Sequence, residues 1–261
     1  MSFDSLAPHY RWMEFVLAGK KLQTCRTAFL TKVLPARNVL ILGEGNGRFL
    51  VECRRSLPDA RITCIDASVQ MLACAKRRCQ EREMGLGKVE FIHADALGWQ
   101  PPPETFDLIV THFFLDCFTP NQLKQLIAKL AQAAAPSADW LLADFRVPAA
   151  GLSRFRAQAI HALMYSFFQA VTQLPTRKLT PPDEFLRMHD FTLTSRMVSE
   201  WGLLHSDRWT RTQPSQPQPN YSFGLSRRTT TNQPLSSSLL PPINEMPSPR
   251  KTVDLANTLP L

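Results

Sequence analysis

No run of apolar residues in this sequence is long enough to cross a membrane, although 44% of its 261 residues are hydrophobic. A spanning helix needs about 18 or more consecutive apolar residues, so no transmembrane segment is expected. The first residues also lack a basic region followed by an apolar one, so we expect no secretory signal. From these absences we expect a cytoplasmic location.

Metal-binding spacings are absent as well. The six cysteines include no Cys-x-x-Cys pair and no grouping with histidine, which favours reduced, mostly structural thiols and no bound metal. The formal net charge of +8 is spread thinly over the chain, and its small basic clusters are not interleaved with aromatic residues. A nucleic acid is therefore not an expected partner.

The most informative stretch is an aliphatic run at 39–42 followed by Gly43, Gly45 and Gly47. The run is typical of a strand buried on both faces of a parallel sheet, and a helical pattern follows the glycines. Glycines permit positive φ and let the backbone approach a ligand closely. A dinucleotide-binding turn would need glycine at position 48, where Arg48 stands. The stretch predicts a cofactor cradle at a helix N-terminus, with an ordinary strand-to-helix connection as the alternative.

Further strand-like segments alternate with helical ones along the chain. Strands are expected at 61–65, 89–93, 106–110 and 140–143, and helices after the glycines, at 69–83 and at 120–134. This alternation predicts a doubly wound α/β sheet, Rossmann-like, with parallel strands and helices on both faces. Ligands of such sheets bind outside the carboxyl ends of the strands. The residues expected at that edge are Gly43 to Gly47, Asp66, Asp95, His112 and Asp144.

Asp66 follows the second strand directly and lies 19 residues beyond Gly47. That is about where adenosine-cofactor folds place an acidic residue on the ribose, and a carboxylate can accept from both ribose hydroxyls. An aspartate here could instead cap the next helix, but Ser68 is better placed to do so. We therefore predict that Asp66 binds a ribose, and that Asp95, after the third strand, lies near an adenine edge.

The flanking segments complete a three-part organisation. We expect a helical arm at 1–35, a cofactor-binding domain at 36–212 and a Pro/Ser/Thr-rich tail at 213–261 that does not fold. Within the domain, an apolar helix at 152–174 is expected to bury or to cover a pocket, and a short helix is expected at 181–189. Segments 191–197 and 203–209 predict a hairpin that closes the sheet edge.

The motifs resemble those of the class I S-adenosylmethionine-dependent methyltransferases over residues 1–212. Residues 39–48 look like their first motif, and residues 66–75 are similar to their Asp-x-Ser-x-x-Met-Leu-x-x-Ala segment. The N-terminal arm is similar to the ubiquinone/menaquinone-biosynthesis branch, which acts on small molecules. The resemblance implies a seven-stranded sheet, mostly parallel with an antiparallel last strand. It also implies S-adenosyl-L-methionine as cofactor and a small-molecule acceptor.

The resemblance also implies a set of cofactor-binding residues: the glycines around the methionine moiety, Asp66 on the ribose and Asp95 at the adenine. The full set is Gly43, Glu44, Gly45, Gly47, Asp66, Ala67, Met71, Asp95, Ala96 and Thr111. One position departs from the family pattern, because Ile41 stands where many members have an acidic residue. Glu44, Asp116 or water are the alternatives for the contact to the amino group.

The predicted reaction is methyl transfer to a small, apolar or aromatic acceptor by in-line displacement. His112 is the candidate general base if the acceptor must lose a proton, and a hydrogen-bonded structural histidine is the alternative interpretation. The candidate substrate-side residues are Tyr10, Asp116, His161 and Tyr165.

Two other functions stay open at this point: an RNA methyltransferase, and a non-catalytic scaffold that binds S-adenosylmethionine. The fourth strand ends in Thr111-His112-Phe113-Phe114, without the Asn/Asp-Pro-Pro-aromatic motif of many enzymes that methylate bases. The intact glycines and Asp66 argue against a scaffold. A lipid or quinone acceptor at a membrane surface also stays open, since the 152–174 helix could lie at an interface. The sequence predicts no oligomeric state.

Overall fold

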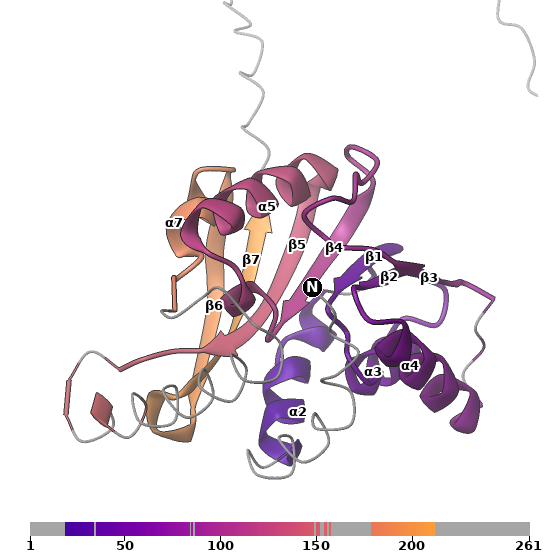
Figure 1. Cartoon of the computed structure of the whole chain (residues 1–261), viewed down its shortest axis with the longest axis horizontal. Helices are drawn as coiled ribbons and strands as arrows, with labels where there is room; N and C mark the ends of the chain where they lie inside the picture. The colour runs from indigo at the N-terminus through magenta and orange to yellow at the C-terminus, as the bar shows by residue number, and fades with distance from the viewer. Residues whose placement is uncertain are drawn as a thin grey trace, which may run out of the picture. The chain divides into compact units, whose positions relative to one another are not determined.

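The computed structural model describes residues 19–33, 35–83, 85, 87–148, 150–151, 154–155, 157 and 179–211. A seven-stranded sheet of order β3-β2-β1-β4-β5-β7-β6 organises them (Figure 1). Its strands are β1 (Asn38–Leu42), β2 (Arg61–Asp66), β3 (Val89–His93), β4 (Phe106–His112), β5 (Ala134–Phe145), β6 (Phe191–Ser199) and β7 (Leu204–Arg211). Strands β1 to β5 are parallel, and β7 runs antiparallel to both β5 and β6. The predicted α/β fold is confirmed.

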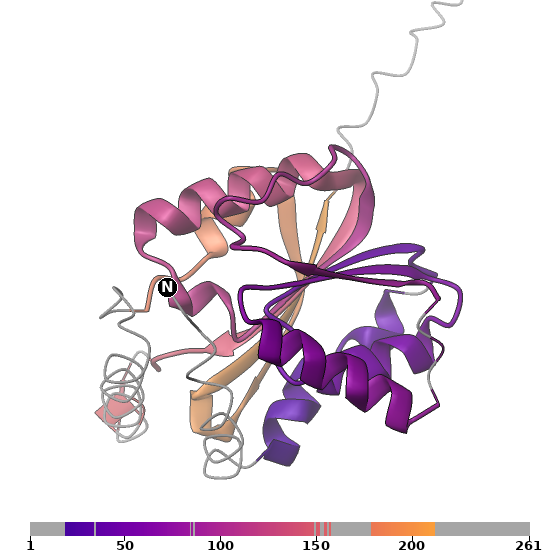
Figure 2. The same ribbon diagram turned by 45° about the vertical axis from the view of Figure 1, so that its right-hand side comes forward.

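Helices cover both faces of this sheet (Figure 2). The helices are α2 (Gly19–Thr27), α3 (Arg48–Ser56), α4 (Val69–Glu81), α5 (Pro120–Ala133) and α7 (Asp183–Arg187), with short 3-10 turns η2 (Leu30–Lys32), η3 (Leu115–Cys117) and η4 (Glu200–Gly202). Successive residues of β1 enter separate cores: Leu40 and Leu42 pack beside α5, whereas Val39 and Ile41 pack beside α3. A strand buried on both faces, as predicted from its aliphatic run, lies at the centre of the sheet.

Local sequence sets where the helices begin at the carboxyl edge of the sheet. Ser68 is the N-cap of α4, and its hydroxyl accepts a hydrogen bond from the Met71 N–H at 3.2 Å, as the sequence predicted. A capping box of Thr119 and Gln122, with Pro120 between them, starts α5. Helix α3 differs, because Gly47 occupies its N-cap and provides no side chain.

The predicted hairpin is present at the sheet edge, and its second strand, β7, is the antiparallel last strand that the resemblance implied. Strand β7 pairs with β5 inside the sheet, and β6 forms the edge. Strand β5 begins at Ala134 rather than at 140, because Ala134 pairs with Phe106 before an irregularity in the ladder. The predicted helix at 152–174, the tail at 213–261 and the first 18 residues of the arm lie wholly or mostly outside the described residues. Within the described ranges, no helix is both long and apolar enough to span a bilayer.

Gly47 gives a first prediction about stability. It adopts φ +84°, and a Cβ atom there would lie 2.6 Å from Cα of Ala75 in α4. We expect Gly47→Ala to lower the free energy of unfolding by about 2–4 kcal/mol, from the left-handed backbone and the overlap together. Urea denaturation measures the change. Gly87→Ala is the control, since no atom lies within 4 Å of a Cβ there, and equal effects of the two changes would contradict the prediction.

Candidate functional site

The glycine turn, defined as residues 43–47, leaves β1 at the point where the strand order of the sheet reverses. Gly43 and Gly45 both have positive φ, +64° and +66°. The Gly43 N–H donates to the Ile65 carbonyl oxygen at 2.9 Å, which ties the turn to the end of β2. A Cβ on Gly43 would overlap the ring of Phe114, so only glycine fits at that position. The turn is thus fixed by packing within the protein itself.

The carboxylate of Asp66 points toward the glycine turn. Its Oδ2 accepts from the Gly45 N–H at 3.2 Å, and its Oδ1 accepts from the Ser68 N–H at 2.9 Å. Partial burial raises the pKa of Asp66 above its usual value, and these N–H donors oppose part of that rise. One carboxylate therefore connects the ends of β1 and β2, and its ribose contact stays a prediction.

Glu44 caps α3 from inside the turn. Its Oε1 accepts from the N–H groups of Phe49 at 2.9 Å and Leu50 at 3.0 Å. These are two of the N–H groups that a helix leaves unpaired at its start. Burial raises the pKa of Glu44 to about 7, while the two N–H donors and the charge of Arg26 oppose the rise. Glu44 thereby shapes the turn, and its direct contact with a cofactor stays a prediction.

Asp95 comes just after β3, the strand that pairs with β2, and so lies at the strand end next to that of Asp66. It is exposed, and its Oδ1 accepts from the Leu97 N–H at 2.9 Å, while Ala96 is buried. The Ala94 N–H donates to the Asp66 carbonyl oxygen at 3.2 Å, so the ends of β2 and β3 are joined. The structure therefore brings the predicted ribose and adenine residues to neighbouring strand ends. Ala67 follows Asp66, and Met71 lies in the first turn of α4.

The last two residues of β4 point to opposite faces of the sheet. Thr111 is fully buried, and its hydroxyl accepts from the Trp140 indole N–H at 2.8 Å. The side chain of Thr111 is therefore not available to a ligand. His112 packs edge-on against Phe49, with 4.6 Å between ring centroids. Burial, with a smaller contribution from the charge of Arg26, lowers the pKa of His112 well below its usual value, so the imidazole is neutral at pH 7.

Two carboxyl groups lie at the carboxyl ends of β4 and β5: Asp116 in η3, just after β4, and Asp144, the second-last residue of β5. Burial raises the pKa of Asp116 to about 6. Asp144 is 2% exposed, and burial together with the charge of Asp116 raises its pKa well above the usual value. Burial is the main cause that raises the pKa of Cys117. The charges of Asp116 and Asp144 raise it further, and the charge of Asp66 adds a smaller effect. The pair is thus within electrostatic reach of the ribose side of the site.

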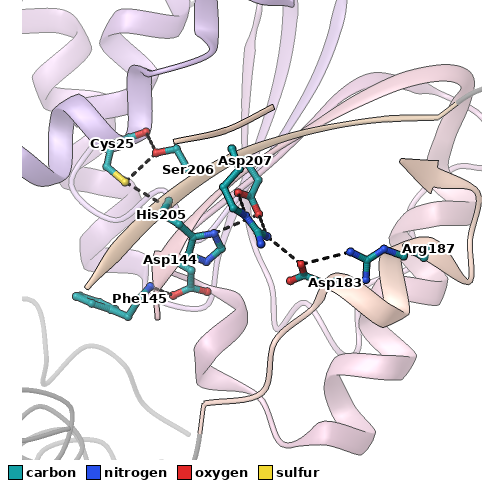
Figure 3. A network of polar contacts seen from close by, with 9 residues as sticks. Cys25, Asp144, Phe145, Asp183, Arg187, His205, Ser206 and Asp207 are labelled. Carbon is teal, nitrogen blue, oxygen red and sulfur yellow. Dashed lines mark hydrogen bonds and ion pairs between the residues drawn. The ribbon is translucent and has the colours of Figure 1, made fainter. Parts of the chain in front are cut away.

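Figure 3 shows the polar network of β7 beside Asp144. Asp207 of β7 accepts from Nε and Nη2 of Arg196 at 2.7 and 2.6 Å, and Nδ1 of His205 lies 3.1 Å from its Oδ2. Nη2 of Arg196 also donates to Asp183 of α7 at 2.9 Å. His205 is the register partner of Asp144 in the sheet. Strand β7 therefore places a charged network directly next to the carboxyl pair.

Arg26 is the residue that the sequence analysis missed. It comes from α2, is 6% exposed, and its guanidinium carbon lies 5.2 Å from the centroid of the Phe113 ring. Its charge lowers the pKa of both Glu44 and His112. No spacing rule distinguishes an arginine in a polar helix, so the sequence carried no signal for it.

Several predicted site residues are not placed here. Tyr10, His161 and Tyr165 lie outside the described residues. Within the described part of the chain, no three His, Cys, Asp or Glu side chains gather in a way that could hold a metal ion.

Comparisons with known proteins find methyltransferases that are similar to this chain in sequence or in fold. A family model described as "Methyltransferase domain" matches residues 39–137. The chain is 28% identical to a demethylmenaquinone methyltransferase of Deinococcus radiodurans over 191 residues, which cover 69% of this chain and 77% of that protein. An O-methyltransferase family protein from Burkholderia thailandensis superposes with a TM-score of 0.62 at 16% identity, and the match covers 80% of this chain and 60% of that protein. The N-methyltransferase NodS from Bradyrhizobium japonicum, solved with S-adenosyl-L-homocysteine, superposes with a TM-score of 0.52 at 16% identity over 74% of this chain and 84% of NodS.

The capping role of Glu44 predicts a pH-dependent stability. Its pKa is about 7 in the folded protein against 4.5 ordinarily, so the folded state binds more protons between these values. Stability therefore falls as the pH rises from about 4.5 to 7, by on the order of 1–3 kcal/mol. Glu44→Gln keeps an oxygen that can accept from both N–H groups but carries no charge. We expect the Glu44→Gln variant to gain stability relative to the unmodified protein as the pH rises from 5 to 8.

Urea denaturation at the two pH values measures this difference. Glu52→Gln, which alters an exposed carboxylate on the same helix, is the matched control. A stability difference for Glu44→Gln that does not change with pH would contradict the prediction.

Proposed function

Because the chain is a class I S-adenosylmethionine-dependent methyltransferase, we propose that it methylates a small, apolar or aromatic acceptor with S-adenosyl-L-methionine as the donor. The observation that carries the proposal is the pairing of the Asp66 carboxylate with the Gly45 N–H at 3.2 Å. A ribose bound by Asp66 has the glycine turn on one side and Asp95 on the other. That order matches the order of sulfur end, sugar and base in the cofactor.

The residues of this edge fit the cofactor in chemistry as well as in order. Oxygen acceptors at Asp66 and Asp95 suit ribose hydroxyls and an adenine amino group. The buried side chains of Ala96 and Met71 suit the apolar adenine face. When bound, the cofactor supplies a methyl group that its sulfonium already activates. The main task left to the protein is to hold the acceptor in line, and such positioning is worth about 7–11 kcal/mol.

The acceptor side is rich in aromatic groups. The rings of Phe114 and Phe118 are 5.1 Å apart, and both pack against the core beside α5. Both follow β4, as Asp116 does. The similar Deinococcus protein is named for a demethylated menaquinone, an aromatic acceptor with oxygen substituents. A quinol or phenol would pack its ring against the aromatic side chains and hydrogen-bond its hydroxyl groups to the carboxyl groups. We propose this acceptor class.

If the acceptor loses a proton as the methyl group arrives, two side chains compete for the role of base. His112 is neutral but a weak base, because its pKa is well below the usual value. Asp116, with a pKa of about 6, is ionised near neutrality and basic enough to accept a proton. We therefore assign the base to Asp116, supported by Asp144, and keep His112 as the alternative.

The first test is cofactor binding. We expect the unmodified protein to bind S-adenosyl-L-homocysteine in isothermal titration calorimetry. Asp66→Asn should bind it about 10–100-fold more weakly, because hydrogen bonds to a charged acceptor are lost. Asp59→Asn is the control, since that carboxylate is 95% exposed and far along the chain from the turn. Unchanged affinity in Asp66→Asn would contradict the assignment.

The second test is turnover. A screen that detects S-adenosyl-L-homocysteine release should respond to quinols, phenols or related aromatic acceptors. Binding of the cofactor without release on any acceptor would instead support a non-catalytic scaffold, and turnover on RNA alone would support the nucleic-acid alternative.

The base assignment predicts a difference between two variants. Asp116→Asn should lower kcat about 10²–10⁴-fold and remove an ascending pH limb near 6, while cofactor affinity is retained. His112→Gln should keep that limb. The kcat of each variant is measured across pH 5 to 9 on the best acceptor. If only His112→Gln loses the ascending pH limb of kcat, the general base is His112 and not Asp116.

A further inference from the structure

A small core cluster joins three segments of the chain, 19–27, 143–157 and 199–204. Its buried members are Leu22, Cys25, Ala143, Phe145, Ala157, Leu203 and Leu204. Consecutive Cα atoms are only about 3.8 Å apart, so residues one or two positions from these members lie in the same region of the molecule. The cluster therefore brings together the start of α2, the end of β5 and the turn between β6 and β7.

Three large apolar side chains are exposed around this cluster. Trp201 is 81% exposed, Phe155 71% and Val147 36%. Each of them lies two residues from a member of the cluster. Single apolar residues are common on protein surfaces, whereas two aromatic rings and a valine in one region are typical of an interaction site. We call these three side chains the apolar patch.

The turn that carries Trp201 has an unfavourable backbone conformation. It lies at the lower end of β6 and β7 in Figure 1, and the three residues of η4 have φ of +53°, +60° and +86°. A bulky residue such as tryptophan rarely adopts positive φ. Contacts with other elements fix the turn, because Glu200 forms an ion pair with Lys21 and the Arg146 N–H donates to the Leu203 carbonyl oxygen at 2.8 Å. The exposed Trp201 gains little from packing, and strain of this kind is concentrated at functional sites.

The charges around the apolar patch are mostly positive. Lys20 and Lys21 in the first turn of α2 are exposed, and so is Arg154. The three segments contain six basic residues and only two acidic ones, Asp144 and Glu200. Asp144 is 2% exposed, and Glu200 is the ion-pair partner of Lys21. The region therefore combines exposed apolar rings with an excess of positive charge.

We propose that the apolar patch docks the protein on an anionic lipid surface. Trp201 and Phe155 insert among the lipid headgroups, and the basic side chains around them face the lipid phosphates. Tryptophan is enriched where proteins meet the interface between membrane and water. Basic residues beside an inserted apolar group add attraction to anionic lipids. This combination of rings and positive charge favours a lipid surface over an uncharged protein partner.

The same edge of the sheet connects to the acceptor side of the site. Val198 is 46% exposed and is the register partner of His205, which in turn is the register partner of Asp144. Register partners share one face of the sheet, so a row of three side chains runs from the surface to Asp144. This step alone rests on the proposed function: an apolar acceptor dissolved in the bilayer would reach Asp144 along this row.

Co-sedimentation with lipid vesicles tests the docking. The unmodified protein should bind vesicles of phosphatidylcholine mixed with anionic phosphatidylglycerol more tightly than vesicles of phosphatidylcholine alone. Binding should weaken as the salt concentration rises from about 0.1 to 0.5 M. Trp201→Asn should bind the mixed vesicles about tenfold more weakly, because its side chain has no apolar ring to remove from water. Asparagine tolerates positive φ, so the turn is kept, and Phe155→Ser should have an effect of similar size.

Two further variants separate charge from general surface effects. Lys20→Gln should weaken binding to the mixed vesicles about fivefold and leave binding to phosphatidylcholine alone unchanged. Met188→Asn is the matched control, because Met188 is 59% exposed but precedes β6, whereas Trp201 follows it. We expect this control to bind both kinds of vesicle as the unmodified protein does.

Thermal unfolding verifies that each variant is folded, and Phe155→Ser and Lys20→Gln decide the matter if Trp201→Asn is not. Absence of vesicle binding by the unmodified protein, or equal binding by the patch variants, would overturn the proposal. A dimer that Trp201→Asn dissociates in sedimentation velocity, without vesicle binding, would overturn it in favour of a second copy as the occupant. Binding of S-adenosyl-L-homocysteine should be the same in all variants, and its absence in the unmodified protein would instead overturn the proposed function.

Discussion

The bond between the Asp66 carboxylate and the Gly45 N–H joins two separate strand ends into one site. A backbone turn rich in glycine has little intrinsic preference for a single conformation. Asp66 supplies that preference from β2, while the Gly43 N–H adds a second link to the same strand. The Asp66 carboxylate and the glycine turn are therefore positioned by the same contacts. A change that displaced one would displace the other.

The two ends of the site differ in electrostatics because they face different sides of the sheet. On the side of α2 and α3, the charge of Arg26 is felt by Glu44 and His112. On the side of α5, the charge of Asp116 raises the pKa of Asp144, and the charges of both groups raise the pKa of Cys117. Strand alternation separates the two groups, since adjacent residues of a strand point to opposite faces. One sheet therefore carries a cationic group on one face and an acidic pair on the other.

The sequence predicted the sheet well because its signals are local. The aliphatic run of β1 and the Ser68 cap each depend on a few neighbouring residues, and both appear where expected. From the sequence, the glycines were explained by the close approach of a ligand. The structure adds a second reason, because a Cβ atom on Gly43 or Gly47 would overlap Phe114 or Ala75.

Contacts between distant segments account for what the sequence did not reveal. The use of Glu44 as a helix cap, the approach of Asp144 to Asp116 and the position of Arg26 all depend on how segments pack in three dimensions. The same holds for the order of β6 and β7, because a hairpin pattern does not state which of its strands joins the sheet.

Strand β7 links the two ends of the site through a single register. Ser206 faces α2, whereas His205 and Asp207 face the side of the carboxyl pair. A slip of one residue would exchange these faces, releasing α2 and placing a hydroxyl beside Asp144. The two-pronged bonds of Arg196 to Asp207, and of Arg208 to Asp139, hold β7 to the strands on either side. These two ion pairs thereby fix the register that sets both the contact of β7 with α2 and the position of its charged residues beside Asp144.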